Sequence, residues 1–153
     1  MPVGFRDYNH PTMTVRDIMT EAAVTDSPDD TLAEAAAKMR QQQTGSLLVM
    51  EGEALSGIVT ERDVLRIVGE GKDPKSVSLR DAMTTDVVTV RPDSSIREAA
   101  QLMFDKWFRH LPVTDEGGRV VGIISLRDLL TLVAEGMENP EPLTRLTGHK
   151  LVR

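Results

Sequence analysis

Two short segments of the sequence, residues 57–63 and 122–128, place a glycine, a hydroxyl and a carboxylate at the same spacing. In each segment an apolar run leads from the glycine to Thr60 or Ser125, where the pattern predicts that a strand ends and a helix begins. The first turn of a helix has free N–H groups and a partial positive charge, so it suits an anion such as phosphate. Both segments are therefore candidate phosphate-binding sites.

Charged side chains accompany both candidate sites. Arg62 and Arg127 add fixed positive charge, and the carboxylates of Asp63 and Asp128 could accept both hydroxyls of a ribose. Phosphate donors beside a diol acceptor make up half of a nucleotide site. The same spacing also describes a capping box, in which the carboxylate bonds only the N–H at the helix start. Recurrence favours the nucleotide site, and a duplicated structural cap is the alternative.

The two segments belong to a longer internal repeat. Residues 14–20 return 64 positions later as residues 78–84, and one extra residue then changes the offset to 65. The chain is thus predicted to contain two tandem units of about 60 residues, each too small to be stable alone. We expect them to pack sheet to sheet with pseudo-twofold symmetry, which leaves two related clefts between the halves.

Each unit reads as helix, strand, strand, helix. Asp30-Thr31 and Ser94-Ser95 are expected to supply the N-cap oxygens of the first helices, and the second helices are expected to begin at Thr60 and Ser125. The predicted strands cover residues 46–50, 55–59, 111–114 and 120–124, with a short leading strand at 87–90.

Apolar residues at helical spacing are expected to be buried. In the second helices these are Val64, Leu65, Val68, Leu129, Leu130 and Val133. Trp107 and Phe108 end an apolar stripe, so we expect them in the core or in a dimer interface, with stacking on a base as the second role.

The composition of the 153-residue chain excludes several classes of function. No cysteine is present, which excludes disulfides and Cys-containing metal sites, and no His, Asp and Glu cluster has metal-ligand spacing. No run approaches the ~20 apolar residues of a membrane-spanning helix. The start of the sequence lacks an apolar leader, which predicts a cytoplasmic protein. With 24 acidic and 18 basic residues the net charge is −6, so nucleic-acid binding is not expected.

The order and duplication of these motifs resemble the CBS-domain family. The resemblance rests on Asp-x-Met-Thr at 17–20 and 81–84, on Arg-His-Leu-Pro-Val at 109–113 and on both Gly-x-x-Thr/Ser-x-x-Asp segments. It implies an α/β (α+β) fold of two tandem β-α-β-β-α repeats, a Bateman module that forms a homodimer. It also implies that an adenosine ligand (AMP, ADP, ATP or S-adenosylmethionine) binds between the repeats as a regulator, with no cofactor required.

In the family each cleft takes sugar and phosphate contacts from one repeat and base contacts largely from the other. Carried onto this chain, cleft A would contain Thr60, Arg62, Asp63, Val90, Arg91, Arg109 and His110. Cleft B would contain Ser125, Arg127, Asp128, Asp26, Ser27, Gly45 and Ser46. Because more cations are expected in cleft A, our hypothesis is that cleft A prefers a polyphosphate.

The repeat also predicts the domain boundaries. Residues 1–12 would form an N-terminal arm, 13–69 the first repeat, 70–77 a linker, 78–137 the second repeat and 138–153 a C-terminal tail. The leading functional hypothesis is a ligand-sensing module that acts on a protein partner the sequence does not identify. The alternative is a structural dimerisation module with empty clefts. An enzyme is the least expected class, since no nucleophile–base pair or metal constellation emerges.

Overall fold

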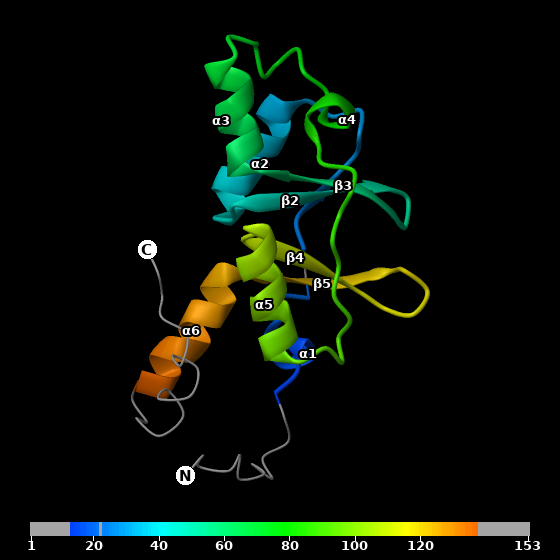
Figure 1. Ribbon diagram of the computed structural model, residues 1–153. Coiled ribbons are helices and arrows are strands. Elements are labelled where there is room, and N and C mark those ends of the chain that lie inside the picture. Colours follow the sequence, from blue (N-terminus) through cyan, green and yellow to red (C-terminus); the bar gives the residue numbers. More distant parts are fainter. Residues whose placement is uncertain (1–12, 22, 138–153) are drawn as a thin grey trace, which may run out of the picture.

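The computed structural model describes residues 13–21 and 23–137, so the expected arm (1–12) and tail (138–153) lie outside the described residues. The first repeat contains β1 (Thr25–Asp26), α2 (Leu32–Gln42), β2 (Ser46–Glu51), β3 (Ala54–Thr60) and α3 (Glu61–Gly69). The second contains α5 (Ile96–Lys106), β4 (His110–Thr114), β5 (Val120–Ser125) and α6 (Leu126–Met137). Each repeat begins with a short helix, α1 (Val15–Ile18) in the first and α4 (Leu79–Ala82) in the second. This is the expected mixed fold of two related repeats (Figure 1).

Side-chain caps fix where the first helix of each repeat begins. The Oγ1 atom of Thr31 accepts a hydrogen bond from the Glu34 N–H at 3.2 Å, and the Oγ atom of Ser95 accepts one from the Glu98 N–H at 3.0 Å. Both are capping boxes, each of which satisfies two N–H groups that the helix itself leaves free. The expected helix starts are confirmed, and the second residue of each expected pair is the N-cap.

The two sheets follow the same plan. In the first, β1 pairs parallel with β2, and β2 pairs antiparallel with β3. In the second, β4 pairs antiparallel with β5. The prediction of a leading strand at 87–90 is wrong. Only Val90 pairs there, through a parallel bridge to Val113. Figure 1 shows the two sheets next to each other at the middle of the molecule, with the β2–β3 and β4–β5 turns on one side.

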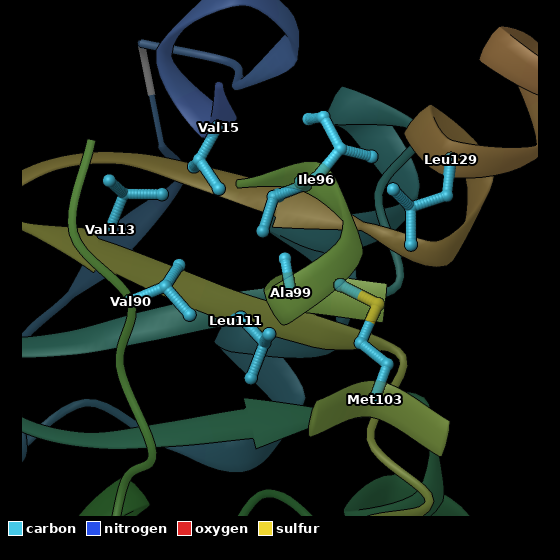
Figure 2. Packing of buried hydrophobic residues seen from close by; sticks show 9 residues of the cluster. Val15, Val90, Ile96, Ala99, Met103, Leu111, Val113 and Leu129 are labelled. Carbon is cyan, nitrogen blue, oxygen red and sulfur yellow. The ribbon is translucent and has the colours of Figure 1, made fainter. Parts of the chain in front are cut away.

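Each short helix packs in the core of the other repeat. Val15 of α1 is fully buried among residues of the second repeat, including Ile96 and Val113 (Figure 2). Leu79 and Ala82 of α4 are buried among residues of the first repeat. Two hydrophobic cores therefore form. The core of the second repeat includes α1, and the core of the first repeat includes α4.

Backbone hydrogen bonds hold this exchange in place. After α1, Thr20 and Ile123 of β5 exchange two N–H···O bonds of 2.9 Å. After α4, Thr84 and Ile58 of β3 exchange the equivalent pair, at 2.9 and 3.0 Å. Each exchanged segment thus adds one bridge to the edge of the opposite sheet, which brings the start of one repeat beside the strand-to-helix junction of the other.

Several apolar residues expected in the core are exposed instead. Leu65 is 74% exposed, Leu130 is 55% exposed and Val68 is 54% exposed, whereas Ile67 and Leu129 carry the buried faces of α3 and α6. Trp107 is not part of the core either, since 77% of its surface is exposed. Its place in a dimer interface and its stacking on a base stay predictions. Helical spacing predicts that these residues share a face, but it does not distinguish a core from an uncovered surface. No helix within the described residues is long and apolar enough to cross a membrane.

Candidate functional site

Cleft A is a pocket of about 220 Å³ at the junction of β3 and α3. Five of the seven residues expected in it do line it: Thr60, Arg62, Asp63, Arg109 and His110. The first three come from the first repeat, and Arg109 and His110 come from the start of β4 in the second. The pocket therefore lies between the repeats, as the resemblance implies.

Val90 and Arg91 do not line cleft A. Val90 is buried, with 4% of its surface exposed, and its backbone bonds to β4. The Arg91 guanidinium donates to the backbone carbonyl of Asp115 instead. The residues that line the pocket from this part of the chain are Thr84, Asp86, Val87 and Val88. Thr84 belongs to the repeated Asp-x-Met-Thr segment, so the repeat itself carried a signal for this wall.

Cleft B is a pocket of about 1030 Å³ at the equivalent junction of β5 and α6. Five of its seven expected residues line it: Ser125, Arg127, Asp128, Gly45 and Ser46. Asp26 and Ser27 do not, because the Asp26 carboxylate accepts from Lys38 Nζ at 3.0 Å and the Ser27 N–H donates to Asp30 at 3.0 Å. Sequence reasoning missed Thr20, Ala23, Val24 and Arg40, which line the pocket in their place.

The strand-to-helix junctions form capping boxes. The N–H of Thr60 donates to Asp63 Oδ2 at 2.8 Å, and the N–H of Ser125 donates to Asp128 Oδ2 at 2.7 Å. The next N–H along each helix is also bonded, that of Glu61 to the carbonyl of Gly45 and that of Leu126 to the carbonyl of Arg109. The structural cap predicted as the alternative is therefore present at both junctions.

The caps leave one oxygen of each carboxylate for another donor. Asp63 Oδ1 lies 3.5 Å from Arg66 Nη2, a long contact, and the Oδ1 atom of Asp128 has no partner within the described part of the chain. A carboxylate can accept several hydrogen bonds, so capping and acceptance from a sugar hydroxyl are compatible. The free oxygen is the more available at Asp128.

Four residues line both clefts: Gly45, Glu61, Arg109 and His110. His110 is half-buried, and burial lowers the pKa of its imidazole by disfavouring the charged form, while the negative charges of Glu61 and Asp128 oppose this shift. A neutral imidazole is therefore favoured in the wall that separates the clefts. The single guanidinium of Arg109 lies within reach of an anion in either cleft.

Ser46 is the buried polar side chain that marks cleft B. Only 2% of its surface is exposed, and within the described residues its Oγ atom has no hydrogen-bond partner. Leaving a buried hydroxyl unbonded costs about 1–3 kcal/mol. Ser46 is also one of the residues that line cleft B.

The charges that line the two clefts reverse the order expected from the sequence. Cleft A is lined by two guanidinium groups and three carboxylates (Arg62, Arg109, Glu61, Asp63 and Asp86). Cleft B is lined by three guanidinium groups and two carboxylates (Arg40, Arg109, Arg127, Glu61 and Asp128). Arg91 is absent from cleft A, and Asp86 and Arg40 were not anticipated. The expectation of more positive charge in cleft A is therefore wrong.

Comparison with known proteins matches both repeats. The sequence model of the CBS domain matches residues 15–70 and 79–135. MK0525 of Methanopyrus kandleri is 39% identical over 121 residues, which cover 78% of this chain and 62% of that protein. The CBS domain-containing protein YhcV of Bacillus subtilis is 38% identical over 117 residues, which cover 76% of this chain and 82% of YhcV.

Solved structures match as well. The CBS-domain pair of protein MJ0100, crystallised with 5′-methylthioadenosine and S-adenosyl-L-methionine, has a TM-score of 0.76 at 25% identity. The match covers 82% of this chain and 98% of that one. Within residues 13–21 and 23–137, no group of three or more His, Cys, Asp or Glu side chains is arranged to hold a metal ion.

Proposed function

This chain belongs to the CBS-domain family, and we propose that it is a ligand-sensing regulatory module whose clefts bind adenosine-containing ligands. The observation that carries the proposal is the junction that occurs twice, once in each cleft. Each junction combines a helix start, an arginine and a carboxylate with an oxygen available to a sugar hydroxyl. The ligands crystallised with the MJ0100 pair support the same class of compound.

We further propose that cleft B takes the more highly phosphorylated ligand. Its volume of about 1030 Å³ is just above the ~300–1,000 Å³ range of ligand pockets, and its arginines outnumber its carboxylates. Cleft A is smaller than that range, and carboxylates predominate in it. A monophosphate or an uncharged nucleoside therefore suits cleft A better, since each additional phosphate would add repulsion there.

A second copy of this chain is the partner we propose for the exposed faces of α3 and α6. Leu65 and Leu130 occupy equivalent positions, 65 residues apart, and both are more than half exposed. A twofold interface between identical chains uses the same surface patch on both chains. The exposed leucines of α3 and α6 form equivalent apolar patches in the two repeats, and exposed apolar patches of this kind mark interaction sites. Sedimentation of the unaltered chain should give a dimer, and the Leu65→Asp/Leu130→Asp variant a folded monomer. A monomeric unaltered chain would exclude this interface.

A thermal-shift panel with AMP, ADP, ATP, NAD and S-adenosylmethionine tests the function. A ligand present at 100 times its dissociation constant adds about 2.7 kcal/mol of stability, which is readily measured as a rise in melting temperature. We expect at least one adenosine compound to raise the melting temperature, and guanosine monophosphate serves as the matched control for the base. If no compound does so, the alternative of a structural dimerisation module with empty clefts replaces this proposal.

A further inference from the structure

Trp107 adopts a backbone conformation that large side chains rarely take. It ends α5 with φ 59° and ψ 29°, in the left-handed region where glycine is normally found after a helix. The equivalent residue in the first repeat, Gln43, has φ 54°. Both repeats therefore have the same left-handed backbone at this position but different side chains. An aromatic residue at this position is strained, and residues kept under strain concentrate at functional sites.

The side chain of Trp107 gains little from the protein core, because 77% of its surface is exposed. What it does border is cleft A. The remaining apolar lining of that cleft comes from Ile58, Val87, Val88, Phe108 and Pro112. An indole beside these apolar side chains has the chemistry that recognises a planar heteroaromatic ring. Gln43 occupies the corresponding position in cleft B, which has no Trp, Tyr or Phe among the residues that line it.

We propose that the indole of Trp107 stacks on the base of the ligand in cleft A and makes this cleft selective for ligands that carry a planar base. The inference rests on the proposed function, since it assigns one part of the adenosine ligand to one side chain. The inference gives the two clefts different roles. Cleft A would select its ligand by contacts with the base, and cleft B would bind its ligand mainly by contacts with the sugar and phosphate. The strain at Trp107 is then the cost of presenting an aromatic face to the ligand.

Fluorescence tests the inference directly, because Trp107 is the only tryptophan in the chain. We expect AMP to quench the emission of the full-length protein. Ribose 5-phosphate, which has the sugar and phosphate without the base, should leave the emission unchanged at concentrations that saturate binding by calorimetry. Binding of AMP with no change in emission would overturn the stacking while leaving nucleotide binding established. No binding of AMP to the unaltered chain would overturn the stacking, and the proposed function would fall with it only if no compound of the thermal-shift panel binds.

Substitutions measured by calorimetry give a second readout, in a background of Asp128→Asn that weakens cleft B. Trp107→Leu should weaken AMP binding about tenfold or more and leave ribose 5-phosphate binding unchanged, whereas Trp107→Phe should retain most of the AMP affinity. The matched control is Phe104→Leu, which alters an aromatic side chain that is 69% exposed on the same helix but does not line cleft A. Equal loss of AMP affinity in the control, or none in Trp107→Leu, would contradict the assignment.

Trp107→Gly separates ligand recognition from a structural role. Glycine relieves the strain of the left-handed backbone, so the ligand-free variant should have a higher melting temperature than the unaltered chain. Its AMP affinity should nevertheless fall as in Trp107→Leu. A lower melting temperature would mean that the indole stabilises the protein by packing on it, which contradicts a ring held out for a ligand.

Discussion

Gly57 lies directly against the backbone carbonyl of Thr84: a Cβ atom on Gly57 would be 2.7 Å from that oxygen. Gly122 has the same relationship with Thr20, at 2.8 Å. These are the points at which each exchanged segment crosses the strand of the other repeat. The glycine that opens each Gly-x-x-Thr/Ser-x-x-Asp segment is therefore required by the close approach of two backbones.

Alanine at either glycine should destabilise the protein. Since the oxygen within 3 Å belongs to the backbone, the crossing segment has to shift, and Gly57→Ala and Gly122→Ala should each lower the free energy of unfolding by about 1–3 kcal/mol. Gly69→Ala is the control, because nothing lies within 4 Å of its Cβ position at the end of α3. Urea denaturation measures all three. An effect of Gly57→Ala no larger than that of Gly69→Ala would contradict the close approach.

Removing the charge of Asp63 or Asp128 should weaken ligand binding with little loss of stability. Asparagine keeps an oxygen that can accept the cap hydrogen bond, but it removes the carboxylate that accepts from a ribose, so affinity should fall about tenfold or more. Asp17→Asn is the matched control: its carboxylate accepts from the Thr14 N–H at 2.8 Å in the same kind of cap, away from both clefts. Calorimetry should find its affinity unchanged, and an equal loss in all three variants would point to a purely structural cap.

Arg109→Ala should weaken the binding of phosphorylated ligands in both clefts, because its side chain lines both. Loss of a charged hydrogen-bond donor corresponds to about tenfold in each dissociation constant. Arg91→Ala, which removes a guanidinium outside both pockets, should leave both constants unchanged. Titration with ATP compares the two variants. A larger loss of ATP affinity in Arg91→Ala than in Arg109→Ala would instead support the placement of Arg91 in cleft A that was expected from the sequence.

The lowered pKa of His110 predicts how stability depends on pH. Burial holds the pKa in the folded state below the ordinary value of 6.5, so the unfolded chain binds more protons at this group in the interval between the two values. The contribution of His110 is therefore fully present above pH 6.5 and is lost as the pH falls toward the folded-state pKa. Denaturation between pH 5 and 8 should show a smaller loss at low pH in His110→Gln. An unchanged pH profile would contradict the burial effect.

The sequence was sufficient to predict the two longer helices of each repeat, the antiparallel strand pairs and both junctions, but not the short helices α1 and α4. Their signals are local: hydroxyls that cap helices, apolar residues at helical or strand spacing, and a repeat that shows the same signals twice. Ten of the fourteen residues expected in the clefts line a pocket for the same reason, since Thr60, Ser125 and their neighbours are positioned by the junctions themselves.

The remaining four residues line neither pocket, because their positions depend on long-range pairing. The pairing of residues 87–90 with β4 decides which valine borders cleft A. Because Val90 pairs with Val113, its side chain is buried in the core, and Val88 lines the cleft instead. Asp26 makes an ion pair with Lys38 that helical spacing does not reveal. The charges of Arg40 and Asp86 reach the clefts from segments that no motif linked to them.

The exchange of α1 and α4 means that neither sequence repeat contains all of its own core. If the chain were cut in the segment 70–77, the N-terminal half would keep Val15 but lose the second-repeat residues on which Val15 packs. The same half would lose Leu79 and Ala82 from the core of the first repeat. Such halves should remain largely unfolded separately and recover native structure when mixed, as complementing fragments do. Duplication here produced an obligate pair within one polypeptide, in which neither copy can be lost, replaced or shuffled without the other.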